Sequence, residues 1–368
     1  MPPPDSLTST ARLIRYAAVF LISLAILSSR LGTDPARDTD EQNYLRAAQA
    51  FLAGAPSTNI EHPPCAKYLI ALSIGIFGNT LLGFHFSSTL AGAFIALAAF
   101  GIALRLTRSL HSACVAWVLM LANGFLFVES RSANLIVFQI AFEVAGFWAF
   151  LVAIEKGSGA WFAWTGALLG LAVACRWSGW PALVVCGAYL FFERRPMAKS
   201  VLVVTASSLA AYLISWIPLL IREHRSFGYL YTANRYILVS HAHYRETMID
   251  SRPLDPWWAS IFRFEQPTSI HQLIGNPVIA SLGLIALLAL LWKRKPLLPA
   301  LYGLHILQWA LVRHLPQYYY YYFDSFTWLT IALAVSLCGI SLRRIRLDVA
   351  VTACALGSAL WPVYAALR

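Results

Sequence analysis

The chain has 368 residues; 59% of them are hydrophobic, only 12% are charged, and the formal net charge is +11. A soluble globular domain carries about 25% charged residues, so this composition excludes an ordinary soluble protein and favours a polytopic helical membrane protein. The basic residues fall in short clusters between apolar runs, which is how membrane topology is encoded. The positive charge therefore does not indicate nucleic-acid binding.

The six cysteines show neither a CxxC pair nor a metal-ligand spacing, and four of them lie within apolar runs. A Cys in an apolar run behaves as a small hydrophobic residue, so no disulfide framework is predicted. The first apolar run, 13–29, lacks a small-residue cleavage site. We expect it to be retained as a membrane anchor rather than removed as a signal peptide.

Residues 66–78 form an apolar run that is too short to cross a bilayer. They give roughly 20 Å of helix against a hydrocarbon core of about 30 Å, so we expect this run to lie along the outer interface. Every basic cluster then falls on the cytoplasmic side, with the N-terminus inside and the C-terminus outside. The sequence thus predicts an all-α, multi-pass protein of the plasma (inner) membrane. Its eleven predicted spans are 13–31, 83–104, 111–129, 132–154, 160–175, 178–192, 199–221, 271–292, 297–313, 318–341 and 347–367.

This topology leaves two long segments on the outer side, 32–82 and 222–270, within a single membrane domain, 1–368. No internal repeat and no separate soluble block is visible in the sequence. The tyrosine run 318–322 fits an interfacial aromatic belt, with sugar stacking as the alternative. The second outer segment carries ionisable and aromatic residues without an assigned role: His241, His243, Asp250, Asp255, Trp257 and Trp258.

Residues 40–53 have the apolar spacing of an amphipathic helix that lies on the membrane, with Glu41 on its polar face. Ionisable residues crowd this helix and the loop after it, although the chain has only 17 acidic residues. Charged groups beside a bilayer are costly, so their default interpretation is functional. We therefore predict the active-site loop of an enzyme that works at the membrane surface. The crowded residues are Asp38, Asp40, Glu41, Glu61, His62 and Lys67.

Asp40 lies at the first turn of this helix, and its position has two interpretations. It could cap the helix, with Thr39 and Gln42 forming a capping box. It could also act as a general base that takes a proton from an acceptor hydroxyl. The two roles are compatible, because a fixed cap is also an oriented carboxylate.

The same acids could instead bind a hard divalent cation, with Asp40, Glu41, Glu61 and His62 as ligands. Their spacing matches no strong metal motif. We therefore assign no metal site and no certain cofactor, and leave a divalent cation as an alternative.

Three basic residues are candidates for binding a lipid phosphate. Lys67 lies one turn after Pro63-Pro64, which end the loop rigidly; it either snorkels to the headgroups or contacts the phosphate. Arg131 and Arg176 lie at outer helix ends, and arginine binds phosphate in bidentate fashion while keeping its charge. Interfacial anchoring beside the neighbouring tryptophans is the alternative for Arg176.

The ordered motifs resemble those of the protein O-mannosyltransferase family, within the polytopic GT-C glycosyltransferases. Two departures stand out: the acid that the family carries near Ile136 is missing, and Arg176 replaces a lysine. Cys65-Ala66 also replaces Leu-Gly in the histidine-proline motif. The matching elements are Asp40-Glu41, His62-Pro-Pro-Cys-Ala-Lys67, Ser130-Arg131, Leu169 to Gly179, and Gly275-Asn276-Pro277-Val278-Ile279.

The resemblance implies an inverting transfer of mannose, or a related hexose, from a polyprenyl-phosphate donor to a Ser/Thr hydroxyl of a protein on the outer side. Asp40, paired with Glu41, would be the catalytic base. Arg131, Arg176 and Lys67 would neutralise the leaving lipid phosphate. The remaining loop residues, Glu41, Glu61 and His62, would shape the site, and Asn276 would cap a helix next to Pro277.

Two alternatives stay open at the level of sequence. A related transferase could use the same donor and glycosylate lipid A or a cell-surface polysaccharide. A transporter is less favoured, because transporters place charges near the bilayer midplane and often show inverted repeats. The expected partners are thus a polyprenyl-phosphate sugar, a protein or glycan acceptor and membrane lipids.

Overall fold

The computed structural model describes residues 9–29, 31, 39–193, 198–247, 276–311, 322–337, 341–342, 345–346 and 348–357. Several residues named above lie outside this described part of the chain. They include Asp38, Asp250, Asp255, Trp257, Trp258 and the tyrosines at 318–321, and the side chains of His241 and His243 are likewise outside it.

The described residues are almost entirely helical, which confirms the predicted all-α fold. The exceptions are two short strands, β1 (Ser341–Leu342) and β2 (Ile345–Arg346), which pair antiparallel. The helices are α1 (Ser9–Leu27), α2 (Thr39–Ala53), α3 (Cys65–Phe77), α4 (Leu81–Thr107), α5 (Leu110–Leu121), α6 (Gly124–Glu129), α7 (Leu135–Lys156), α8 (Gly159–Cys175), the 3-10 turn η3 (Trp177–Gly179), α9 (Trp180–Glu193), α10 (Ala198–Ser215), α11 (Ile217–Arg222), α12 (Gly228–Thr247), α14 (Pro277–Trp292), α15 (Leu297–Leu311) and α16 (Phe323–Ser336).

Four helical stretches among the described residues are long and apolar enough to cross a membrane: Ser9–Leu27, Leu81–Thr107, Leu135–Lys156 and Lys199–Arg222. Shorter apolar helices occupy most of the other predicted spans, and α3 has the 13 residues expected of the interfacial run. Leu13, Leu202 and Leu288 are more than half exposed, as lipid-facing side chains are. The count of eleven spans stays a prediction.

Two predicted spans are interrupted, and one helix was not expected. The run 111–129 is divided into α5 and α6 at Asn123, whose side-chain oxygen accepts the Phe125 amide hydrogen at 3.1 Å. The run 199–221 is divided at Trp216, because Pro218 in the first turn of α11 has no amide hydrogen to continue the helix. Helix α12 lies at the start of the second outer segment.

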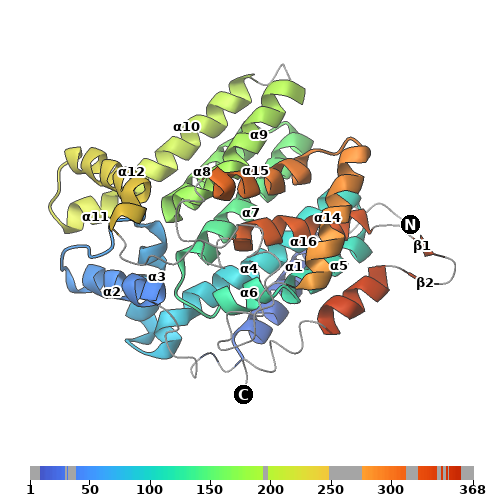
Figure 1. Cartoon of the computed structure of the whole chain (residues 1–368), viewed down its shortest axis with the longest axis horizontal. Coiled ribbons are helices and arrows are strands. Elements are labelled where there is room, and N and C mark those ends of the chain that lie inside the picture. Colours follow the sequence, from blue (N-terminus) through green and yellow to red (C-terminus); the bar gives the residue numbers. More distant parts are fainter. Residues whose placement is uncertain are drawn as a thin grey trace.

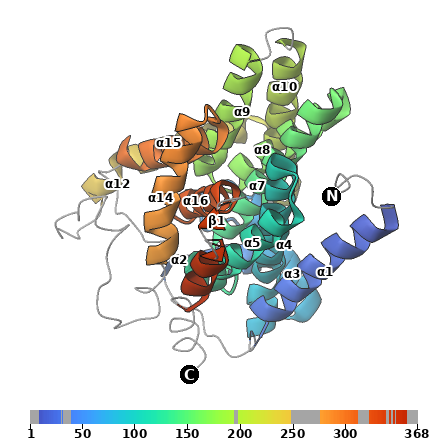
Figure 2. The same cartoon turned by 90° about the vertical axis from the view of Figure 1, so that its right-hand side faces the viewer.

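Helix α7 forms the centre of the bundle, and 83% of its apolar stretch is buried inside the protein. Helices α4 and α8 pack against it, and α1 lies at the edge opposite α14 and α15 (Figure 2). Helices α8 and α10 approach closely because Gly166 and Gly170 lack side chains. A Cβ at either glycine would lie 2.2 Å from a carbonyl oxygen of α10.

The two ends of α7 distinguish the two ends of the bundle. At its C-terminal end, Glu155 forms ion pairs with Arg105 of α4 and with Arg108, the residue that directly follows α4. At its N-terminal end lies the turn that carries Arg131. Since α4 runs parallel to α7 and α8 runs antiparallel to it, the first residues of α4 and the last of α8 share that second end, which we call the site end. Helices α2 and α3 lie together there, beside α11 and α12 (Figure 1).

Asn276 confirms its predicted role as a helix cap. Its side-chain oxygen accepts the amide hydrogens of Val278 and Ile279 at 3.1 and 3.2 Å, at the start of α14. Its side-chain amide donates to the carbonyl oxygens of Ala122 and Ala355 at 3.2 and 3.0 Å. One side chain thus joins three helical segments that lie far apart in the sequence.

Candidate active site

Glu41 is buried, and its predicted place on the polar face of α2 is wrong. Its side chain is fully inaccessible. Oε1 accepts hydrogen bonds from His85 Nε2 of α4 at 2.8 Å and from the Ala133 amide at 2.7 Å. Helix α2 is therefore fixed to the helical bundle rather than held only by the membrane surface. A carboxylate with two donors fixes its first turn to the start of α4 and to the turn after Arg131.

His85 is a residue that the sequence analysis missed. It is one ionisable side chain within a long apolar helix, which is by itself a signal of function or of a buried partner. The partner could not be identified from sequence because it lies 44 positions away, in α2.

The loop between α2 and α3 is held by Lys67 rather than left open. Lys67 Nζ donates to the carbonyl oxygen of His62 at 2.8 Å and to that of Asn59. The lysine is 4% exposed, so it does not snorkel to the headgroups. Burial lowers its pKa to about 7, and the attraction of Glu61 opposes that shift. Pro63-Pro64 end the loop as predicted, and α3 begins directly after them.

Two further loop residues face neighbours within the same loop region. The side-chain amide of Asn59 donates to Glu61 Oε2 at 2.9 Å. The ring of His62 lies edge-on to Tyr44 of α2, with 5.9 Å between the ring centroids. Asp40 is only partly buried at the second position of α2, so its carboxylate is less enclosed than that of Glu41.

Arg131 is buried in the turn between α6 and α7, with 1% of its surface exposed. Its Nη1 donates to the carbonyl oxygens of Leu27 and Ser29 at 3.0 and 2.5 Å, where α1 ends. Its guanidinium carbon lies 5.1 Å from the centre of the Phe127 ring. The guanidinium is therefore fixed in orientation by backbone and ring contacts at the site end.

Arg176 ends α8 in an extended conformation and is 5% exposed. Its guanidinium carbon lies 5.4 Å from the centre of the Trp309 ring of α15. The thiol of Cys175, the residue before it, lies beside the thiol of Cys65, the first residue of α3. The histidine-proline motif and the Arg176 motif are thus neighbours in space.

Two contacts relate α2 and the start of α3 to the predicted phosphate ligands. Glu41 takes the amide hydrogen of Ala133, two residues after Arg131. Cys65, two residues before Lys67, contacts the residue that precedes Arg176. The structure therefore gathers the residues of the α2–α3 loop region and both arginines at the site end, as the predicted topology led us to expect.

A second group of ionisable residues was missed altogether. Glu143 of α7, His305 of α15 and Asp324 of α16 are fully buried, and His305 contacts both carboxylates. Each is an isolated ionisable residue in an apolar run, which is a signal of function. Only the packing of three helices shows that they form one group, which we call the buried ion cluster.

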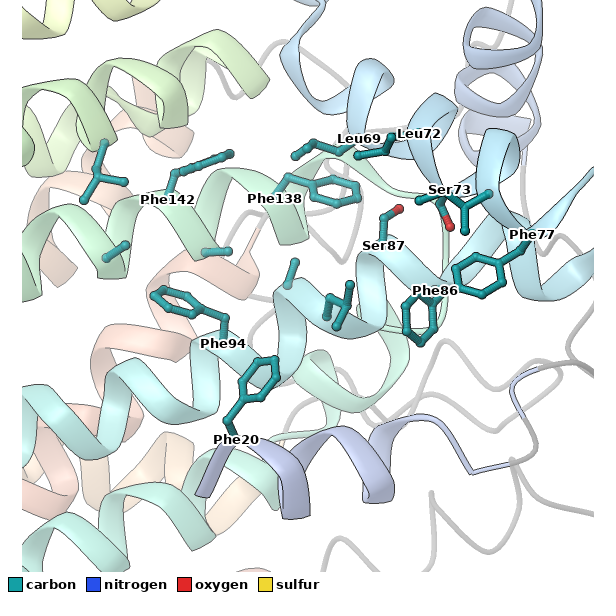
Figure 3. Close-up of a pocket in the computed structure, with 16 residues that line it drawn as sticks. Phe20, Leu69, Leu72, Ser73, Phe77, Phe86, Ser87, Phe94, Phe138 and Phe142 are labelled. Carbon is teal, nitrogen blue, oxygen red and sulfur yellow. The ribbon is translucent and has the colours of Figure 1, made fainter. Parts of the chain in front are cut away.

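An apolar cavity of about 550 Å³ lies beside the site end, between α1, α3, α4 and α7 (Figure 3). Leu69, Leu72 and Phe77 of α3 and Phe138 and Phe142 of α7 form much of its wall. Hydroxyl groups come from Ser73 and Ser87. Leu69 follows Lys67 by two residues, so helix α3 carries both a wall of the cavity and a candidate phosphate-binding lysine.

No three His, Cys, Asp or Glu side chains are arranged to hold a metal ion in the part of the chain that the structure describes. Of the four predicted cation ligands, Glu41 directs one oxygen to His85 and Ala133. The divalent cation stays a prediction.

Residues 61–220 match the family described as Dolichyl-phosphate-mannose-protein mannosyltransferase. A polyprenol-phosphate-mannose–protein mannosyltransferase of Mycolicibacterium smegmatis is 34% identical over 143 residues, 33% of this chain and 28% of that protein. The protein of that name from Corynebacterium glutamicum is 28% identical over 219 residues, 49% of this chain and 42% of that protein. The resemblance predicted from the motifs is confirmed. The match spans less than half the length of either relative, and Asp40-Glu41 precede the family segment.

Two solved structures have the same fold. One is ArnT from Cupriavidus metallidurans bound to undecaprenyl phosphate, with a TM-score of 0.58 and 18% identity, covering 91% of this chain and 61% of that one. The other is AglB from Archaeoglobus fulgidus in complex with an inhibitory peptide and a dolichol-phosphate, with a TM-score of 0.57 and 13% identity, covering 96% and 55%. The chain is a membrane protein with the GT-C fold.

Proposed function

We propose that this protein transfers mannose, or a related hexose, from a polyprenyl-phosphate donor to a Ser/Thr hydroxyl of a protein, with inversion, on the outer side of the plasma membrane. One observation carries the proposal. A segment similar to protein mannosyltransferases contributes Lys67, Arg131 and Arg176 to one end of a helical bundle. The acidic pair Asp40-Glu41 lies at that same end, through the contact of Glu41 with Ala133.

In this proposal the two acids of the pair have different tasks. Asp40, which is partly exposed, takes the proton from the acceptor hydroxyl as it attacks the anomeric carbon. Glu41 keeps the first turn of α2 in place through His85 and Ala133, and so orients Asp40. Glu61 and His62 complete the loop that shapes the acceptor side.

The donor is bound by cations at its phosphate and by apolar surface along its prenyl chain. Arg131, Arg176 and Lys67 stabilise the charge that develops on the departing lipid phosphate. The apolar cavity receives the isoprenoid units next to that phosphate, because α3 carries both Lys67 and the cavity wall. The relatives named for polyprenol-phosphate-mannose and the undecaprenyl phosphate bound to ArnT support this choice of donor.

Labelled polyprenyl-phosphate mannose, incubated with membranes that contain the protein, tests the proposal. Label is expected in acceptor protein; label in lipid A or polysaccharide instead would establish the alternative acceptor. Asp40→Asn should nearly abolish transfer without lowering Tm. Glu155→Gln, which changes a carboxylate at the opposite end of the bundle, is the matched control and should keep its activity. Normal turnover by the Asp40 variant would exclude Asp40 as the base.

The phosphate ligands and the divalent cation are tested separately. Arg131→Ala should weaken donor binding more than acceptor binding, and unchanged donor affinity would reassign Arg131 to the structural contact with α1. Treatment with EDTA, followed by addition of Mg²⁺ or Mn²⁺, decides whether a cation bound by the loop acids is needed.

A further inference from the structure

The buried ion cluster places one imidazole between two carboxylates. His305 Nε2 lies 2.6 Å from Glu143 Oε1, and Nδ1 lies 3.0 Å from Asp324 Oδ2. Gln308 Nε2 also lies 3.3 Å from Nδ1, but the carboxylate is closer and charged. Asp324 Oδ2 has no hydrogen-bond partner among the described residues, so its contact with Nδ1 is a charge contact rather than a hydrogen bond. Two carboxylates this close to the ring stabilise a positive charge on it. The arrangement therefore favours the imidazolium, which has a proton on each nitrogen.

Two carboxylates and one imidazolium leave one negative charge in excess, inside an apolar bundle. A buried charge without compensation is strongly destabilising. Part of the compensation comes from indole donors: Trp328 Nε1 donates to Glu143 at 2.9 Å, and Trp309 Nε1 contacts Asp324 Oδ1 at 3.4 Å. The face of the same Trp309 ring holds the Arg176 guanidinium, so a positive charge approaches from the site end.

A second chain of contacts runs from the cluster to the backbone that follows Arg176. Gln139 Nε2 donates to Glu143 Oε2 at 3.3 Å, and Ser178 Oγ donates to Gln139 Oε1 at 2.7 Å. Gln308 Nε2 donates to the Ser178 carbonyl oxygen at 3.2 Å. Ser178 lies in the turn η3, which begins directly after Arg176. The cluster thus contacts Arg176 from two sides, through the side chain of Trp309 and through the turn.

We propose that Glu143, His305 and Asp324 are positioning residues that hold Arg176, through Trp309 and the η3 turn, in the orientation that binds the donor phosphate. This inference rests on the proposed function, since it takes Arg176 as a phosphate ligand. The ligand class is a lipid-linked phosphate monoanion or dianion. None of the three cluster residues touches the substrate; they act by fixing the arginine.

A purely stabilising role explains the cluster less well. Replacing a buried ion group with apolar side chains of similar volume is often neutral or stabilising, so stability alone does not require one here. An arginine loses substantial rotamer freedom when it is fixed. Prior orientation by Trp309 removes that loss from the binding step, which increases affinity for the phosphate.

Trp309→Phe keeps an aromatic ring at this position and removes the indole N–H to Asp324, together with part of the ring volume. Asp324→Asn removes the charge and keeps the shape. We expect either change to raise the KM for the polyprenyl-phosphate sugar about tenfold, the equivalent of one hydrogen bond to a charged group. The KM for the acceptor should change little. Trp117→Phe, which removes an indole hydrogen bond to Ser23 at 2.8 Å far from the cluster, is the matched control.

A double-mutant cycle separates positioning from general loosening of the bundle. In an Arg176→Ala background, Trp309→Phe should have no further effect on donor KM, because the group it orients is gone. Binding of undecaprenyl phosphate to the purified protein should show the same non-additivity.

Independent, additive effects of the two changes, or an equal effect of Trp117→Phe, would overturn the inference while leaving the proposed function intact. A wild-type protein that neither binds undecaprenyl phosphate nor transfers labelled sugar would overturn both. The Tm of each double variant is compared with that of its parent. Additive losses of donor affinity at a normal Tm would contradict the positioning role.

Discussion

Two fully buried histidines near the site end have opposite surroundings. His85 meets one carboxylate, Glu41, through Nε2, and its Nδ1 has no hydrogen-bond partner among the described residues. His305 meets a carboxylate at each nitrogen. The first needs only a neutral ring, whereas the second favours the imidazolium. A histidine and a carboxylate thus join two helices at His85, whereas a histidine and two carboxylates form a group of opposite charges at His305.

The free-energy cost of losing a partner therefore depends on which group is left without one. Near His85 a mutation leaves an unsatisfied polar group. Loss of His305 from the buried ion cluster leaves two carboxylates without their cation in a medium of low dielectric constant, which is the more severe penalty.

The largest expected effect follows from removing the central cation. His305→Leu leaves Glu143 and Asp324 as neighbouring carboxylates and should destabilise the protein by about 3–5 kcal/mol. Thermal unfolding in detergent measures the loss. Replacing Glu143 by Leu in the same variant removes one of the two charges and should recover part of it. A His305→Leu protein as stable as the wild type would contradict the charged state of the cluster.

Glu41→Leu is expected to have a smaller effect, because it removes an acceptor rather than a compensating charge. The Ala133 amide and the His85 ring each lose a partner, at about 1–3 kcal/mol for a buried group. Glu41→Gln keeps an acceptor oxygen and should lose less. A Leu variant with the Tm of the wild type would show that these contacts contribute nothing to stability.

Lys67 gives an effect that depends on pH. Because burial lowers its pKa from 10.5 to about 7, the unfolded chain binds more protons than the folded one between those values. Stability should therefore rise with pH across that range, by at most about 1.4 kcal/mol per pH unit. The control is Lys67→Met, which should lose this component. Wild-type and variant Tm curves that run parallel from pH 7 to 10 would contradict the buried, partly neutral lysine.

The smallest effect is expected for the exposed ion pair between Arg108 and Glu155, 2.8 Å long, in which Arg108 is 51% exposed. Solvent screens such pairs, so Arg108→Ala should change stability by about 0.2–1 kcal/mol. The change should shrink further in high salt. A loss comparable to that of His305→Leu would remove the distinction between buried and exposed charges.

The sequence predicted those features that depend on local patterns. The proline pair gave the start of α3, Asn276 beside Pro277 gave a helix cap, and thirteen apolar residues gave the short helix α3. The predicted topology led us to expect the loop and the two arginines at one end of the bundle, and the contacts of Glu41 and Cys65 place them there.

The remaining features depend on how distant helices are rotated against one another. Glu143 and His305 are separated by 162 positions, and each is a single ionisable residue in an apolar run. Periodicity indicates that such a side chain needs a partner but not which helix supplies it. The prediction for Glu41 was wrong for the same reason. Amphipathic spacing assigns its side of α2 to water, but Glu41 contacts His85 and Ala133 in the protein interior.

Asn276 has a consequence for biosynthesis. The carbonyl oxygen of Ala122, where α5 ends, accepts a hydrogen bond from a side chain 154 positions later. While the chain is being inserted, that carbonyl reaches the bilayer well before its amide partner has been translated. An unsatisfied carbonyl in hydrocarbon is costly, so the break between α5 and α6 must stay hydrated or shielded by another protein until α14 arrives. Assembly of this half of the bundle is thus completed only after its last third has been made.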